Sequence, residues 1–249
     1  MKIFYNKFNL KFLLIFFFLI CLSLASYFYL SPKPVIPPTV ILNLFQDPAS
    51  PTPSPFPPKY LIKTEFVEQA PEKNWDQPWQ DACEEATLLT VDFYYQNKKA
   101  TPSSVRQAIL DMIDYETKQG FSHDINLTQM AQVASAYLGY QTKIINDPTL
   151  LQIKQFLLEN TPVIIPANGK TLFAENPNFN QGGPYYHNLT ILGYDDKSSQ
   201  FIVHDVGTRR GAYFRYSYSL LLESIHDLPS SFDKKEINTG PKRVLILLK

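Results

Sequence analysis

The chain of 249 residues has two cysteines, and only Cys83 lies outside the hydrophobic N-terminal run that contains Cys21. Cys83 therefore has no disulfide partner in the rest of the chain. It follows a loop (77–82, QPWQDA) and opens a helical pattern, which predicts a place in the first turn of a helix. The positive end of a helix dipole favours the nucleophilic thiolate. Glu84 and Glu85 would oppose this ionisation if their charges lay near the sulfur.

A histidine and an aspartate can be placed by hairpin geometry. The segment from His187 to Asp205 has a turn signal, Asp-Asp-Lys-Ser (195–198), at its centre. If two strands pair around that turn, His187 and Asp205 lie directly opposite one another, with Cβ atoms about 4.5–5.5 Å apart. At that distance a carboxylate can accept a hydrogen bond from the imidazole and fix its tautomer. A slip of one residue would separate them, so the prediction depends on the register.

Two glutamines precede the cysteine. Gln77 lies six residues before Cys83, and its side-chain amide could donate to the oxyanion that forms when a thiolate attacks a carbonyl group. Gln80 is an alternative donor. A free cysteine taken alone is more often a buried core residue than a catalyst. The combination with a glutamine and a histidine–aspartate pair favours the catalytic interpretation.

The apolar pattern predicts helices first and strands later. Helices are expected over 83–96, from Thr101-Pro102 onward, over 127–138 and from Asp147-Pro148 to about 159, and strands over 162–166, 187–194, 201–206, 212–216 and 243–248. This order predicts the α+β class with a mostly antiparallel sheet. The segments 75–80 and 169–184 are expected to be loops. The second is long, and long loops in compact domains are usually functional.

These residues and their order resemble the C39-like cysteine peptidases of bacteria. The resemblance covers roughly 61–227 and is strongest over 81–86 (DACEEA) and 187–195 (HNLTILGYD). It implies a papain-like fold, with the N-terminal helical part packed on the sheet and the chain order Gln, Cys, His, Asp. It also implies the roles of the site residues: Cys83 as nucleophile, His187 as general base, Asp205 as its orienting partner and Gln77, preferred over Gln80 on family spacing, as oxyanion donor.

The resemblance further implies a hydrolase that cleaves peptide or amide bonds of a peptide or protein substrate through a thioester. The sequence departs from many relatives at two positions, with Glu84 where glycine is frequent and Val206 where proline follows the aspartate. Two alternatives stay open, an inactive papain-fold module that binds peptides or cell-wall fragments, and an acyl transferase. The sequence leaves the substrate, the cleavage specificity and the oligomeric state undetermined.

The N-terminus predicts a membrane segment. Lys2, Lys7 and Lys11 precede an uncharged run (12–30) that is about long enough to cross a bilayer as a helix. The lysines should stay in the cytoplasm and send the rest of the chain outside. We therefore expect a single-pass anchor in the cell membrane with the catalytic domain outside. The rival is a cleaved signal peptide, ending near the small residues of 23–25, which would leave a secreted protein.

Three parts follow from this reading: the membrane anchor or signal segment (1–30), a proline-rich linker (31–59) and a peptidase domain (60–249). The dense prolines of the linker favour an extended spacer. An apolar patch (40–45) interrupts the linker, and its role is left open.

Charge and histidine spacing argue against other partners. From position 60 onward the chain has 18 basic and 22 acidic residues and no basic stripe, so nucleic acid is not expected as a partner. His123 and His226 lack the spacing of metal ligands, and His204 is expected to face away from its neighbour Asp205. We expect no metal and no cofactor.

Overall fold

The computed structural model describes residues 56–249, which belong to one compact unit. The predicted membrane segment (12–30), the linker up to residue 55 and its apolar patch lie outside the described residues. Within 56–249, no helix is both long and apolar enough to cross a bilayer. The chain enters the sheet at β1 (Lys59–Leu61).

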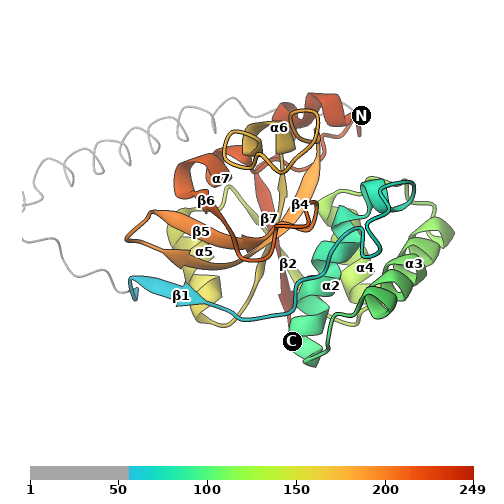
Figure 1. Ribbon diagram of the computed structural model, residues 1–249, viewed down its shortest axis with the longest axis horizontal. Helices are drawn as coiled ribbons and strands as arrows, with labels where there is room; N and C mark the ends of the chain where they lie inside the picture. The colour runs from blue at the N-terminus through green and yellow to red at the C-terminus, as the bar shows by residue number, and fades with distance from the viewer. Residues whose placement is uncertain (1–55) are drawn as a thin grey trace, which may run out of the picture. The chain divides into compact units, whose positions relative to one another are not determined.

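Seven antiparallel strands form one sheet in the order β2-β7-β3-β4-β5-β6, and β1 pairs with the end of β4 (Figure 1). The remaining strands are β2 (Gln141–Asn146), β3 (Val163–Ala167), β4 (His187–Asp195), β5 (Gln200–His204), β6 (Phe214–Ser217) and β7 (Arg243–Leu248). The central strands β3, β4 and β7 are buried along nearly their whole length. The predicted α+β class with an antiparallel sheet is confirmed.

The helices are η3 (Trp79–Asp81), α2 (Cys83–Gln96), α3 (Pro102–Lys118), α4 (Leu127–Ala136), α5 (Leu150–Leu158), α6 (Gly169–Leu172), α7 (Tyr218–Ser224) and η4 (Lys234–Thr239). Capping boxes at Thr101, Asn126 and Thr149 start three of them, because each cap side chain accepts a backbone N–H of the first turn. The cap of α5 is therefore Thr149, and the prediction that the helix starts from Asp147-Pro148 is wrong by two residues.

Helix α2 packs on β4 and contacts α3 and α4, and α4 itself packs on β2 and β7. One apolar core joins α2, α3 and α4, and a second joins the sheet with α5, α6 and α7. Figure 1 shows α2, α3 and α4 grouped beside the sheet. Because α2 packs along β4, its first residue, Cys83, lies beside Asn188 at the start of β4, with Asn188 Nδ2 3.9 Å from the sulfur.

Several elements differ from the predictions for local physical reasons. The edge strand β2 alternates exposed and half-buried residues, and its polar members hide the strand pattern. The predicted loop 169–184 begins with the short helix α6, which Asn168 caps. Helix α4 ends at Ala136, two residues before the predicted end.

Candidate active site

Cys83 is the first residue of α2, as the sequence predicts. The cap residue before it, Ala82, makes no side-chain hydrogen bond to the helix. The N–H groups of a first helical turn have no partner within the helix, so the N–H of Cys83 is available to an anion. The loop before the cysteine is held by the buried ring of Trp79 in the short helix η3. This anchor sets where the helix, and therefore the thiol, begins.

The thiol of Cys83 is buried and lies between two polar side chains. It donates to Glu84 Oε2 at 2.9 Å and receives a long contact from Asn188 Nδ2 at 3.9 Å. Burial and the neighbouring Glu84 carboxyl raise the pKa of the thiol well above its usual value. In this arrangement Cys83 is a neutral thiol turned toward Glu84.

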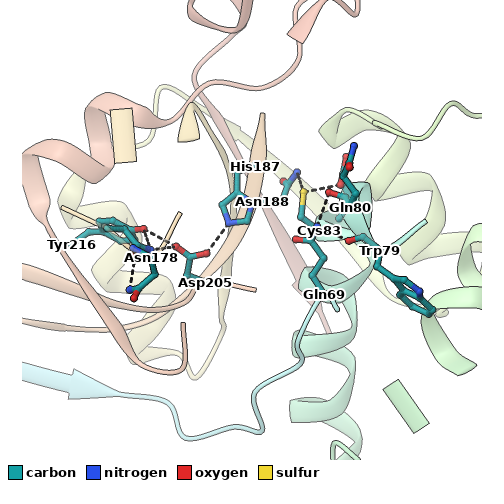
Figure 2. A network of polar contacts seen from close by, with 11 residues as sticks. Gln69, Trp79, Gln80, Cys83, Asn178, His187, Asn188, Asp205 and Tyr216 are labelled. Atoms are coloured by element: carbon teal, nitrogen blue, oxygen red, sulfur yellow. Dashed lines mark hydrogen bonds and ion pairs between the residues drawn. The ribbon is translucent and has the colours of Figure 1, made fainter. Parts of the chain in front are cut away.

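His187 and Asp205 form a buried pair. His187 Nε2 lies 2.8 Å from Asp205 Oδ1, and the other carboxylate oxygen accepts from the Tyr216 hydroxyl at 2.6 Å and from Asn176 Nδ2 at 2.9 Å. Figure 2 shows Asp205 between Tyr216 and His187. A carboxylate with three donors has a fixed position. Since Nε2 faces Asp205, Nδ1 is the ring nitrogen left to exchange a proton with a thiol.

The contact between this pair is the predicted one, but the predicted register is wrong. The β4–β5 ladder ends at Thr190↔His204, and His187 pairs with Ala167 of β3 instead. The shift between Ile191 and Gly193 marks a bulge. The main cause is the turn itself: Asp195 pairs with Gln200, so the turn spans residues 196–199 and lies later in the chain than the midpoint of the segment from His187 to Asp205. Asp205 reaches the ring from just beyond the end of β5.

Gly207, two residues beyond Asp205, packs against the ring of His187. A Cβ atom at this position would lie 2.6 Å from Cε1 of the histidine. On another side, the ring of Phe179 meets the imidazole edge-on, with 5.4 Å between centroids. The imidazole is therefore held in place by the Asp205 carboxylate, the Phe179 ring and the backbone of Gly207, which has no side chain.

The structure does not bring Gln77 to the nucleophile. The Gln77 side chain is exposed and bonds Asp81, and it does not line the cleft that contains Cys83. Gln80 reaches the cleft but is also exposed. The prediction of the oxyanion donor therefore needs correction, because the Gln77 side chain lies outside the cleft and bonds Asp81 instead.

Gln69 lines the same cleft as Cys83 and is buried. Its Nε2 donates to the carbonyls of Trp79 and Gln80 at 2.9 Å each, and its Oε1 has no partner (Figure 2). Sequence spacing does not identify this residue, which lies further from the cysteine than Gln77. The glutamine ties the loop before Cys83 to the segment after β1, so its amide stands beside the nucleophile.

A cleft of about 750 Å³ contains both Cys83 and His187. Within residues 56–249 the sulfur makes no hydrogen bond to the imidazole, since it is turned to Glu84. In the view of Figure 2, His187 lies between Asp205 and Cys83. Two partly exposed aromatic side chains, Trp75 and Tyr185, also line the cleft.

The rim of the cleft carries an excess of positive charge. Lys234 pairs with Asp124 at 2.9 Å and with Asp81 at 3.5 Å. Arg209 and Arg210, in the loop that follows Asp205, also line the cleft, and neither makes a hydrogen bond or ion pair within residues 56–249. The charge of Arg209 acts on Glu68, and guanidinium groups that lack an ion pair suit a carboxylate on a bound molecule.

The remaining histidines lie apart from this site. His204 is buried with its ring edge-on to Phe66 and Tyr213, and burial lowers its pKa to about 4. It is therefore a neutral core residue, as its place beside Asp205 predicts. In the part of the chain that the structure describes, no group of three His, Cys, Asp or Glu residues could hold a metal ion.

Comparisons with known proteins indicate the family of this chain. The model of the Peptidase_C39 like family matches residues 62–225. The fold is similar to a crystal structure of a candidate C39-like peptidase from Bacillus anthracis, at 13% identity and a TM-score of 0.48, covering 77% of this chain and 98% of the other. No curated protein matches the chain significantly. The family model spans well over half of the sequence and includes Cys83, His187 and Asp205, so this chain belongs to the Peptidase_C39 like family.

Proposed function

We propose that this protein is a cysteine peptidase in which Cys83 is the nucleophile, His187 the general base and Asp205 the residue that orients it. The observation that carries the proposal is the buried contact of 2.8 Å between His187 Nε2 and Asp205, which leaves Nδ1 for a thiol at the start of α2. Both side chains line one cleft, which is open to a substrate. Membership of a peptidase family supports a peptide or protein substrate.

The chemistry begins when the Cys83 thiol turns its proton from Glu84 Oε2 toward His187. The thiol proton then passes to His187 Nδ1, and the thiolate attacks the carbonyl carbon of the substrate. As the S–C bond forms, the negative charge moves to the carbonyl oxygen. The imidazolium gives its proton to the leaving amine, the C–N bond breaks and a thioester remains. Water, deprotonated by His187, hydrolyses the thioester and restores the thiol.

Gln69 and the N–H of Cys83 are the proposed oxyanion donors. The backbone N–H is free at the start of α2, and the amide of Gln69 lies in the cleft. One of the two bonds from Gln69 Nε2 to loop carbonyls must be exchanged for a bond to the oxyanion. Preorganised donors of this kind contribute about 10²–10³ in kcat.

The test is alkylation and turnover of the folded protein. Iodoacetamide should label Cys83 stoichiometrically, and Cys83→Ala should abolish hydrolysis in a library of fluorogenic peptides. Asp205→Asn should keep the fold and lower the labelling rate, since it weakens the hold on the imidazole. A folded wild-type protein that shows neither labelling of Cys83 nor turnover of any peptide would refute the proposal.

An inactive binding module is the second candidate, and the resting geometry is the observation that favours it. The sulfur bonds Glu84 rather than His187, and its pKa is raised. Peptide binding that persists in Cys83→Ala, with no labelling of the wild type, would support this candidate. Acyl transfer is separated from hydrolysis by adding primary amines and searching for amide products.

We propose that residues 12–30 anchor the enzyme in the cell membrane with its catalytic domain outside. The support is the uncharged run behind three lysines. Fractionation of cells, followed by protease digestion from the outside, tests this placement. A shortened mature chain in the medium would instead indicate a cleaved signal peptide.

A further inference from the structure

Glu84 presents a buried carboxyl group directly to the nucleophile. Its side chain is fully buried, with Oε2 2.9 Å from Cys83 Sγ and Oε1 accepting the N–H of Ile125 at 3.1 Å. It makes no ion pair within residues 56–249. A buried carboxylate without a cation is costly, and the usual outcome is that the group keeps its proton.

The groups around Glu84 are acidic or neutral on every side. On α2 it follows Cys83 and precedes Glu85. The loop before α4 contributes Asp124, α3 contributes Glu116, the residue before β4 is Tyr186, and β4 contributes Asn188. Lys234, which lines the same cleft as Cys83, is engaged by Asp124 and Asp81. Burial, then the charges of Glu85 and Asp124, raise the pKa of Glu84 well above its usual value.

The thiol and the carboxyl group must share a proton. Two negative charges at 2.9 Å in a buried site repel strongly, so the pair does not lose both protons together near neutral pH. The pair therefore titrates as a unit. Since Oε1 already accepts the Ile125 N–H, Oε2 is the atom left to carry the proton.

We propose that Glu84 is a further catalytic residue, whose protonated carboxyl group donates from Oε2 to Cys83 Sγ and stabilises the thiolate, and whose ionised form suppresses it. The inference rests on the proposed function of Cys83. In the active state the thiolate lies between two donors, Glu84 Oε2–H and the imidazolium of His187. No atom leaves the site, because the proton moves only between sulfur, nitrogen and oxygen. When pH rises, the carboxyl group releases its proton to solvent, and its negative charge drives the proton of the His187 imidazolium back to the sulfur, so that Cys83 returns to the thiol.

The sign of the pH effect follows. Wild-type protein should lose activity on the alkaline side as the shared proton is removed. In Glu84→Gln the amide can keep both contacts, with Oε1 accepting from Ile125 and Nε2 donating to the sulfur, but it cannot ionise. This variant should form the thiolate at lower pH and keep its activity to higher pH than the wild type.

The experiment measures the rate of Cys83 alkylation by iodoacetamide against pH in the full chain, with peptide mapping to separate Cys83 from Cys21. In Glu84→Gln the apparent thiol pKa should fall by about one unit, and alkylation at neutral pH should rise about tenfold. Glu116→Gln is the matched control. It removes a buried carboxyl group of the same cluster that does not touch the sulfur, and its profile should change far less.

Two results would overturn the inference: profiles of Glu84→Gln and wild type that superimpose, or an apparent thiol pKa that rises in the variant. If Glu84→Gln does not fold, the infrared band of a protonated carboxyl group in wild-type protein should change on alkylation of Cys83, and no change refutes the proposal.

Alkylation needs no substrate, so its result is separate from the peptidase proposal. A shifted alkylation profile in Glu84→Gln without turnover of any peptide would refute the peptidase proposal alone. Turnover by the wild type with an unshifted profile in the variant would refute the role of Glu84 alone.

Discussion

The contact between Gly207 and the His187 ring allows a quantitative test of how the general base is held. In Gly207→Ala the new Cβ atom would lie 2.6 Å from the imidazole Cε1 and 3.2 and 3.3 Å from the two ring nitrogens. Ordinary contact begins at 3.4 Å, so the ring must retreat by the difference of 3.4 and 2.6 Å, about 0.8 Å. The ring cannot retreat freely, because Asp205 and the ring of Phe179 already hold it.

A shift of that size is enough to disturb catalysis without unfolding the domain. It can stretch the contact of 2.8 Å between His187 and Asp205 beyond the range of a good hydrogen bond. A misplacement of about 1 Å in a catalytic group can cost about 10²-fold in rate. We expect kcat to fall about 10²-fold, equivalent to about 2.7 kcal/mol of transition-state stabilisation.

The assay compares kcat on a fluorogenic peptide, the alkylation rate of Cys83 and the melting temperature. Gly193→Ala is the control, because its Cβ would meet the carbonyl oxygen of Tyr60 at 2.3 Å, where β1 joins β4. The control should lower stability with little change in kcat. A folded Gly207→Ala protein that keeps kcat within about threefold of wild type would refute the argument that this glycine positions the histidine.

Three further predictions concern other parts of the site. Gln69→Ala should lower kcat by about 10²-fold and Gln77→Ala by less than about threefold, measured on the same peptide, because only the first side chain lies in the cleft. The double variant Arg209→Ala/Arg210→Ala should lower kcat/KM for peptides with acidic side chains about tenfold relative to neutral peptides, an effect that salt should weaken; equal losses for both would contradict it. Burial and a neighbouring carboxyl group raise the pKa of Glu116 above its ordinary 4.5, so the folded state holds a proton that the unfolded state releases. The stability that the Glu116 carboxyl group contributes is therefore full at low pH and falls as pH rises. Between about pH 5 and pH 8 the melting temperature should decline less in Glu116→Gln than in wild type.

The sequence by itself identified the elements whose signals are local. Cys83 at the first turn of α2 follows from a loop, a helical pattern and the single cysteine left outside the N-terminal run. The central strands follow from their continuous apolar residues, and Thr101 from its place before a proline. These signals depend on neighbours in the chain, so they can be read before the fold is known.

Contacts between distant segments required the tertiary structure. The turn between β4 and β5 lies later in the chain than the midpoint of 187–205, so the His187–Asp205 contact was predicted for a pairing that does not occur. Gln69 lies in the cleft beside Cys83 because the segment after β1 returns to the loop before α2. The Gln77 side chain bonds Asp81 outside the cleft.

The environment of the nucleophile also depends on contacts between distant segments of the chain. The sequence places Glu84 next to Cys83, but it does not say whether the carboxyl group faces water or the sulfur. The packing of α2 against α3, α4 and the sheet buries that side chain and leaves its carboxyl group facing Cys83 and the Ile125 N–H. Residue identity and helix position are local properties, whereas burial and the protonation that follows from it depend on every element packed around the site.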